Sequence, residues 1–171
     1  MTNQYHATPY DLSAAGFYFT TYEDYLEKAS NHKNEYGDPV EEYEIQFIDS
    51  DLPWCNGSLF KTLGINQANL DKWFSDFENM SMEDAVKAIY LSDYVRYDIN
   101  DILDRMDDIT LFKGTAQEYA EYYIDDTGLL DTMPENLRYY FDAEAFARDM
   151  VMSGDITEVE INSTQYIAWG G

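Results

Sequence analysis

The chain has few cysteine, lysine and arginine residues and no long apolar run. Its single cysteine, Cys55, excludes an internal disulfide framework and suits a reducing cytoplasm. Only 10 of the 171 residues are Lys or Arg, so the chain lacks the basic footprint that direct binding to nucleic acid or to anionic lipid requires. It has no run of about 18 apolar residues and no basic, apolar leader, so the sequence predicts neither a membrane span nor a signal peptide.

Acidic residues are abundant instead. The chain contains 34 Asp and Glu and has a formal net charge of -24, yet 45% of its residues are hydrophobic and 16% are aromatic. Disordered acidic segments are poor in aromatic residues, so this composition predicts a folded chain with an ordinary core. Because such a charge repels itself in the compact state, we expect it to have a use, and a strongly basic surface is the partner that suits it.

The charge is spread over the whole chain, but unevenly. Residues 1–60 hold 11 acids and 2 bases, residues 61–113 hold 11 and 6, and residues 114–171 hold 12 and 2. The local patterns change in a similar way, from mixed α and β to all helix and back to mixed. The sequence therefore predicts an α+β fold of three small subdomains, with boundaries at residues 1–60, 61–109 and 110–171.

The first third contains two predicted strands and a helix. An aromatic strand at 16–20 precedes a helix that Thr21 caps, and the helix turns Leu26 inward together with its neighbouring tyrosines. From residue 40 to residue 49 apolar and polar residues alternate, which predicts a half-buried strand with an acidic outer face. The sequence leaves the structure of residues 1–14 open.

The rest of the chain reads as helices, followed by a closing hairpin. Helices are predicted around 70–77, after Ser81 and over 98–109, where an apolar face opposes Asp98, Asp101, Asp104 and Asp108. A strand at 110–113 precedes helices that open at Thr115, in a capping-box pattern, and at Asp142. The last two strands are predicted to turn at Asn162-Ser163.

Motifs for other kinds of chemistry fail on inspection. An EF-hand-like stretch has Leu103 where the loop needs Gly and Ile109 where it needs Glu. His6, His32 and Cys55 do not form a spaced set of zinc ligands. A glycosidase-type pair cannot be picked out of 34 carboxylates. We therefore expect no metal, no cofactor and no enzymatic activity.

Acidic residues recur on three of the predicted elements. On one helix alone they would indicate a solvated face, but their recurrence with few bases indicates a surface that meets positive charge. Duplex DNA carries one negative charge per about 1.7 Å of axis, so half of the acids on one ridge would match roughly 29 Å of duplex. We expect the outward acids to act together as phosphate surrogates: Glu41, Glu42, Glu44, Asp49, Asp51, Asp98, Asp101, Asp104, Asp108, Glu118, Glu121, Asp125 and Asp126.

Three stretches of the sequence resemble the ArdA family of antirestriction proteins. The stretch PENLRYYFDAEAFARDM, residues 134–150, is similar to the family's C-terminal signature. The strand EYEIQFID at 42–49 and the helix entry LGIN at 63–66 are similar as well. The resemblance covers the chain from about residue 15 to its end.

The resemblance implies an elongated, acidic homodimer that mobile genetic elements carry. Such a protein mimics DNA and occupies the DNA-binding groove of type I restriction–modification enzymes, formed by their specificity and methyltransferase subunits. The stretch 134–150 matches the family's antirestriction motif, which is associated with the dimer interface; an ordinary pair of core helices is the alternative. The residues suited to an interface are Leu137, Arg138, Tyr140, Phe141, Phe146, Arg148 and Met150.

Two other functions remain open on the sequence. The acidic surface would also suit an inhibitor of another basic nucleic-acid-binding protein, such as an anti-CRISPR-like inhibitor or an antagonist of a nucleoid protein. An enzyme with a buried carboxylate pair would instead need a concave pocket in which two acids converge.

Overall fold

The computed structural model of the protein describes residues 3–50 and 56–170. The chain divides into two compact units, Met1–Ile99 and Asn100–Gly171. Each unit combines helices with a three-stranded antiparallel sheet, which confirms the predicted α+β class. The finer division into subdomains at 1–60, 61–109 and 110–171 stays a prediction.

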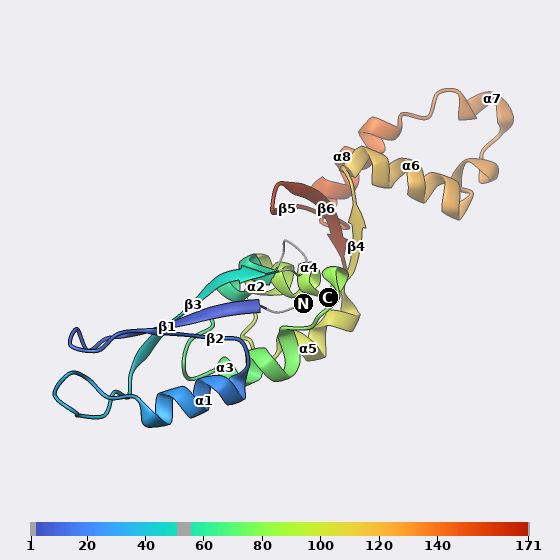
Figure 1. The fold of residues 1–171 in the computed structure, drawn as a ribbon. Coiled ribbons are helices and arrows are strands. Elements are labelled where there is room, and N and C mark those ends of the chain that lie inside the picture. The colour runs from blue at the N-terminus through green and yellow to red at the C-terminus, as the bar shows by residue number, and fades with distance from the viewer. Residues whose placement is uncertain (1–2, 51–55, 171) are drawn as a thin grey trace. The chain divides into compact units, whose positions relative to one another are not determined.

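The first unit is built on a sheet with the strand order β2–β1–β3 (Figure 1). The strands are β1 (Asn3–Pro9), β2 (Phe17–Phe19) and β3 (Tyr43–Ser50), and each pairs antiparallel to its neighbour. The strands β2 and β3 match the two strands that the sequence predicts in this region.

The central strand, β1, lies within residues 1–14, whose structure the sequence analysis leaves open. Tyr5 and Ala7 of β1 are buried, and the residues between and beside them are at least partly exposed, which is the period of a half-buried strand. The buried face hides this pattern in the sequence, because two of its four positions are the polar Asn3 and the strand-ending Pro9. Pro9 is tolerated because it ends the strand.

Aromatic rings fill the core of the first unit. The Tyr5 ring lies 5.3 Å from Phe19, 5.4 Å from Phe47, 5.7 Å from Phe60 and 5.2 Å from Phe74, measured between ring centroids. These distances are typical of favourable aromatic pairs. The high aromatic content of the chain therefore provides the buried area that its many acidic residues cannot provide.

Helices cover the sheet of the first unit and continue beyond it. They are α1 (Tyr22–Asn31), α2 (Asn56–Thr62), α3 (Leu70–Lys72), the π-helical turn η1 (Trp73–Phe77), α4 (Met82–Tyr90) and the π-helical turn η2 (Leu91–Val95). The predicted caps are present, because the Thr21 and Ser81 hydroxyl oxygens accept hydrogen bonds from backbone N–H groups in the first turns of α1 and α4. The inward direction predicted for Leu26 is wrong, because this side chain is exposed on α1.

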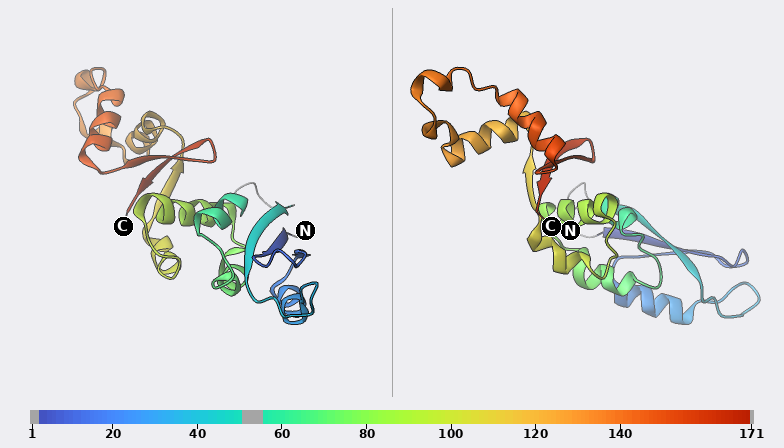
Figure 2. Two further views of the ribbon diagram at one scale, coloured as in Figure 1. Left: turned by 90° about the vertical axis from the view of Figure 1, so that its left-hand side faces the viewer. Right: turned by 180° about the vertical axis from the view of Figure 1, so that it is seen from behind.

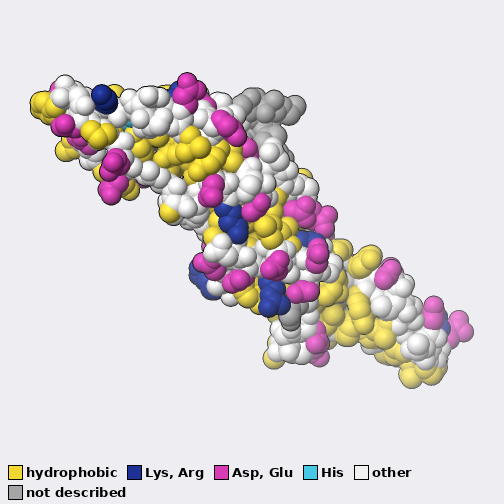
Figure 3. Space-filling view, turned by 90° about the horizontal axis from the view of Figure 1, so that it is seen from below, with side chains coloured by type: hydrophobic (Ala, Val, Ile, Leu, Met, Phe, Trp, Pro, Cys, Tyr) yellow, Lys and Arg dark blue, Asp and Glu magenta, His cyan; other side chains and the backbone are white. Residues whose placement is uncertain are grey.

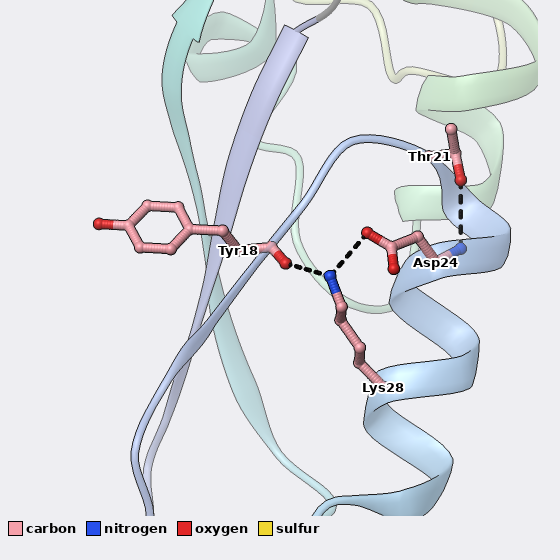
Figure 4. A network of polar contacts seen from close by, with 4 residues as sticks. All are labelled: Tyr18, Thr21, Asp24 and Lys28. Atoms are coloured by element: carbon pink, nitrogen blue, oxygen red, sulfur yellow. Dashed lines mark hydrogen bonds and ion pairs between the residues drawn. The ribbon is translucent and has the colours of Figure 1, made fainter.

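A polar network fixes the start of α1 against the neighbouring strand (Figure 4). The Lys28 ammonium group donates hydrogen bonds to the Tyr18 carbonyl oxygen at 2.7 Å and to the Asp24 carboxylate at 2.8 Å. The Asp24 backbone N–H donates in turn to the Thr21 hydroxyl at 3.1 Å. One of the few lysines thus has a structural role in joining α1 to β2.

The second unit has a sheet with the strand order β4–β6–β5, seen from two further directions in Figure 2. Its helical segments are α5 (Ile102–Arg105), η3 (Met106–Asp108), α6 (Ala116–Thr127), η4 (Leu129–Thr132), α7 (Glu135–Arg138) and α8 (Ala143–Ser153). Its strands are β4 (Thr110–Lys113), β5 (Thr157–Ile161) and β6 (Thr164–Trp169). Small side chains let α6 and α8 pack closely, since Ala116, Ala120 and Ala147 are buried with Ile156 and Ile167 in one cluster.

The local signals of the second unit are confirmed. The Thr115 hydroxyl and the Glu118 carboxylate form a capping box at the start of α6. The Asp142 carboxylate accepts a hydrogen bond from the Ala145 N–H at 2.9 Å and caps α8. Asn162 and Ser163 both have positive φ angles, 49° and 60°, in the tight turn of the β5–β6 hairpin.

The helix predicted over 98–109 is much shorter in the structure. Only Ile102–Arg105 form an α-helix, followed by the 3-10 turn Met106–Asp108. Asp and Asn compete for the backbone with their own side chains and favour turns over helix interiors, so the acidic start of this segment does not continue the helix. Leu103, an apolar residue of this segment, is exposed.

Among the residues that the structure describes, no helix has both the length and the apolar character needed to cross a membrane.

Candidate acidic binding surface

The acidic side chains stay at the surface of both units. None of the Asp and Glu residues within 3–50 and 56–170 is buried, and most are exposed. Figure 3 shows acidic side chains scattered over the face in view, with fewer Lys and Arg side chains among them. The charge is therefore available to a partner and is not hidden in internal ion pairs.

The acids of the first unit lie around β3. Tyr43 and Ile45 are buried while Glu42 and Glu44 are exposed, which confirms the predicted alternation along this strand. The same exposure holds for the neighbouring acids Glu41 and Asp49. Asp51, which belongs to the same predicted group, lies outside the described residues.

The acids predicted on one helix at 98–108 are divided between the two units. Asp98 belongs to the first unit and lies outside any helix, between η2 and α5, whereas Asp101, Asp104 and Asp108 belong to the second unit. All four are exposed. Asp108 forms an ion pair with Arg105 at 3.6 Å, and both side chains are more than half exposed, so this pair removes little of the local charge.

The acids on α6 have two different roles. The Glu118 carboxylate accepts hydrogen bonds from the Thr115 N–H at 2.7 Å and the Thr115 hydroxyl at 3.1 Å, and these bonds hold the pKa of Glu118 below its usual range. Glu121 accepts a hydrogen bond from the Gln117 amide at 3.0 Å. Asp125 and Asp126 are exposed near the end of the helix, where negative charge opposes the helix dipole. Their position is therefore unfavourable for the helix.

The few basic side chains pair mostly with acids close to them in sequence. Ion pairs within the described residues include Lys28–Asp24 at 2.8 Å, Lys87–Glu83 at 3.7 Å, Arg105–Asp108 at 3.6 Å, Arg138–Asp131 at 3.1 Å and Arg148–Asp149 at 3.7 Å. Even if each of the 10 Lys and Arg residues balanced one acid, 24 of the 34 acids would stay unbalanced (34 − 10 = 24). The negative charge of the chain thus greatly exceeds what its own Lys and Arg side chains can balance.

The residues predicted for a dimer interface fall into two groups. Leu137 and Tyr140 are exposed in and just after α7. Phe146 and Met150 on α8 instead pack against the buried cluster of their own unit, and Phe141 contacts Phe146 with 5.6 Å between ring centroids. The stretch 134–150 therefore combines core packing on α8 with an apolar exposed part around α7.

The two arginines of this stretch already have contacts within the chain. Arg138 donates hydrogen bonds to the carbonyl oxygens of Met133 and Asp131, both at 3.2 Å, besides its ion pair with the Asp131 carboxylate. It thereby ties α7 to the segment before it. Arg148 is exposed and contacts its neighbour Asp149.

Carboxylates also line a surface hollow in the first unit. A hollow of about 340 Å³ is bordered by Glu23, Asp71 and Glu78 together with neighbouring side chains. The Glu78 carboxylate accepts hydrogen bonds from the Tyr5 hydroxyl at 2.9 Å and the Asn3 amide at 3.1 Å, so its role is to support β1. No group of three or more His, Cys, Asp and Glu in the described part of the chain is placed to hold a metal ion.

The comparisons with known proteins agree with the resemblance of the sequence. No curated protein matches the chain. The sequence model of the family described as Antirestriction protein (ArdA) matches residues 11–164, which are most of the chain. The chain therefore belongs to the ArdA family of antirestriction proteins.

Proposed function

We propose that this protein is a DNA mimic that inhibits type I restriction–modification enzymes by occupying their DNA-binding groove. Family membership supports an antirestriction role. The observation that carries the mimicry is the large excess of exposed carboxylates on a folded chain, which has a net charge of -24. The target surface is the one that the specificity and methyltransferase subunits offer to DNA.

The acidic surface would act as a whole. DNA-binding grooves are lined with Lys and Arg that contact phosphates, and each exposed carboxylate can take the place of one phosphate. The binding energy would come from many weak contacts and from the release of anions that the free groove attracts. This collective action agrees with a surface on which none of the acids within 3–50 and 56–170 is buried.

We further propose that the protein acts as a homodimer in the cytoplasm of a cell that receives foreign DNA. Two chains would double the length of duplex that the acids can replace, and a two-fold dimer is the commonest way to extend such a surface. The exposed apolar residues Leu137 and Tyr140 support a contact around α7. The Asp131–Arg138 pair would then shape this contact from within one chain.

The alternative is a DNA mimic directed at another basic nucleic-acid-binding protein. The same surface would suit an anti-CRISPR-like inhibitor or an antagonist of a nucleoid protein. Charge does not distinguish these targets, so the choice of target depends on contacts other than those of the acids.

The deciding experiment is displacement of duplex DNA from a purified type I methyltransferase core across a salt series. We expect the protein to displace DNA stoichiometrically, with an affinity that falls steeply as salt rises. If a folded, acidic dimer leaves the DNA bound at low salt, the target is not this enzyme. The same assay on other basic DNA-binding proteins would then test the alternative.

A further inference from the structure

Three large apolar side chains project from one end of the first unit. Leu12 lies in the loop between β1 and β2 and is fully exposed, and Tyr10 in the same loop is 66% exposed. Tyr36 lies in the loop between α1 and β3 and is 76% exposed. The two loops lie at the same end of the unit in the opposite views of Figures 1 and 2. We call these three residues the apolar tip.

The loop that carries Leu12 is held in one conformation. The Asp11 carboxylate accepts hydrogen bonds from the Ser13 N–H at 2.9 Å and the Ser13 hydroxyl at 2.6 Å. Its second oxygen accepts a hydrogen bond from the Asn34 side-chain amide of the other loop at 2.9 Å. These bonds lower the pKa of Asp11, and a further backbone hydrogen bond joins Glu35 to Ser13 at 3.0 Å. The two loops therefore form one ordered structure.

The loop that carries Tyr36 is ordered by the same asparagine. The Asn34 side-chain oxygen accepts hydrogen bonds from the N–H groups of Tyr36 at 3.0 Å and Asp38 at 2.9 Å. Gly37 has a φ angle of 90°, a conformation that side chains rarely adopt, so a glycine suits the turn beside Tyr36. Because both loops are ordered without a partner, the tip would lose little conformational entropy on binding.

Acidic residues surround the tip and restrict its partner. Glu35, Asp38 and Glu42 are exposed in the same two loops, and Tyr10 is bonded through its N–H to the Glu42 carbonyl oxygen at 3.1 Å. This charge repels nucleic acid, anionic membrane and a second copy of the same tip. The surface that complements the tip has a nonpolar pocket surrounded by Lys and Arg. Only a protein partner offers such a surface.

We propose that the apolar tip anchors the protein to its basic target by inserting Leu12, with the two tyrosines beside it, into a nonpolar pocket. The inference rests on the proposed function, since the target is the same DNA-binding protein. DNA has no apolar side chains to offer, so the tip supplies a contact that mimicry of phosphates cannot. It would distinguish one basic target from another, which charge alone does not.

The test measures binding of the intact protein to the type I methyltransferase core from low to high salt. The variants are Leu12→Ser and the double change of Leu12→Ser with Tyr36→Ser. Because burial of apolar surface depends little on salt, we expect each variant to bind more weakly by a constant factor, at least about tenfold for the double variant, at every salt concentration. The slope of log affinity against log salt should stay unchanged.

The matched control is Leu26→Ser, which changes an exposed leucine on α1 in the same unit. It should bind as the unchanged protein does. Thermal unfolding of all variants checks the fold, and the Leu12 change should leave stability intact because the side chain is fully exposed.

Each outcome has a definite meaning. Unchanged affinity of the double variant would overturn the anchor and leave the proposed function standing, whereas failure of the unchanged protein to bind would overturn both. A lower mass of the double variant in sedimentation, compared with the unchanged protein, would assign the tip to contact between copies and would also overturn the anchor.

Discussion

Two buried tyrosines in the core of the first unit differ in what their hydroxyl groups contact. The Tyr5 hydroxyl accepts a hydrogen bond from the Trp73 indole at 2.7 Å and donates one to the Glu78 carboxylate at 2.9 Å. The Tyr25 hydroxyl is buried without a hydrogen-bond partner in the described part of the chain. The pair offers a matched comparison of one satisfied and one unsatisfied buried hydroxyl.

Removal of the two hydroxyls should have opposite consequences. We expect Tyr5→Phe to lower the free energy of unfolding by about 1–3 kcal/mol, because the Trp73 N–H is left without its acceptor. Tyr25→Phe should be neutral or stabilising, because it removes an unsatisfied polar group. Urea unfolding followed by circular dichroism measures both, and equal losses would show that the hydrogen bonds of Tyr5 do not matter.

Tyr25 should also make the fold sensitive to alkali. Burial, with Tyr43 and Tyr22 nearby, raises the pKa of Tyr25 to about 12, whereas an unfolded tyrosine ionises near about 10. The folded state then binds more protons than the unfolded state, so stability is complete below about pH 10 and is lost as the pH rises toward 12. Tyr25→Phe should lose less stability than the unchanged protein as the pH rises from about 10 to about 12, the interval between the unfolded and the folded pKa. The exposed Tyr36→Phe controls for the loss of a phenol.

At the scale of single elements, the turn of the β5–β6 hairpin carries strain that can be removed. Ser163 has a φ angle of 60°, in the left-handed region that costs a residue with a Cβ about 1 kcal/mol. We expect Ser163→Gly to raise the free energy of unfolding by about that amount, since Asn-Gly is the preferred pair for this turn. Ser163→Ala removes the hydroxyl but keeps the Cβ, so it should give no such gain. A melting temperature that rises in Ser163→Gly alone would assign the gain to relief of backbone strain, and an equal rise in both variants would assign it to loss of the hydroxyl.

Elements with a local signal were predicted well, and those without one were not. Thr21, Thr115 and Asp142 each cap a helix as the sequence predicts, because a cap acts within one turn of its own chain. The helix predicted over 98–109 is wrong in length. The prediction followed the spacing of the apolar residues, whereas the folded chain follows the weak helix propensity of Asp and Asn. The strand β1 was missed because its place depends on pairing with β2 and β3, which lie further along the chain.

At the scale of the whole molecule, the charge should act collectively. We expect any single Asp→Asn change to leave binding to the methyltransferase core nearly unchanged. Neutralising six exposed acids together should weaken binding and flatten its dependence on salt, because fewer anions are released. The six are Asp101, Asp104, Asp108, Glu121, Asp125 and Asp126.

A control with the same net charge separates position from total charge. It neutralises six exposed acids outside the predicted surface and outside the two loops of the apolar tip: Glu23, Glu27, Asp71, Glu83, Asp93 and Glu158. If both sets weaken binding equally, only the total charge matters and the predicted surface is not a distinct one. Loss of binding through a single Asp→Asn change would contradict the collective action of the acids.

The amino-acid sequence by itself determined the class of the fold, the helix caps, the family and the excess of negative charge. These follow from composition and from short stretches of chain, which keep their meaning wherever the chain folds. The tertiary structure alone decided that Tyr5 of an unpredicted strand lies at the centre of an aromatic core. It also decided that Asp11 and Asn34, 23 residues apart, join two loops around an exposed leucine. Such contacts depend on which segments far apart in the sequence pack together, and this packing leaves no pattern in the local sequence.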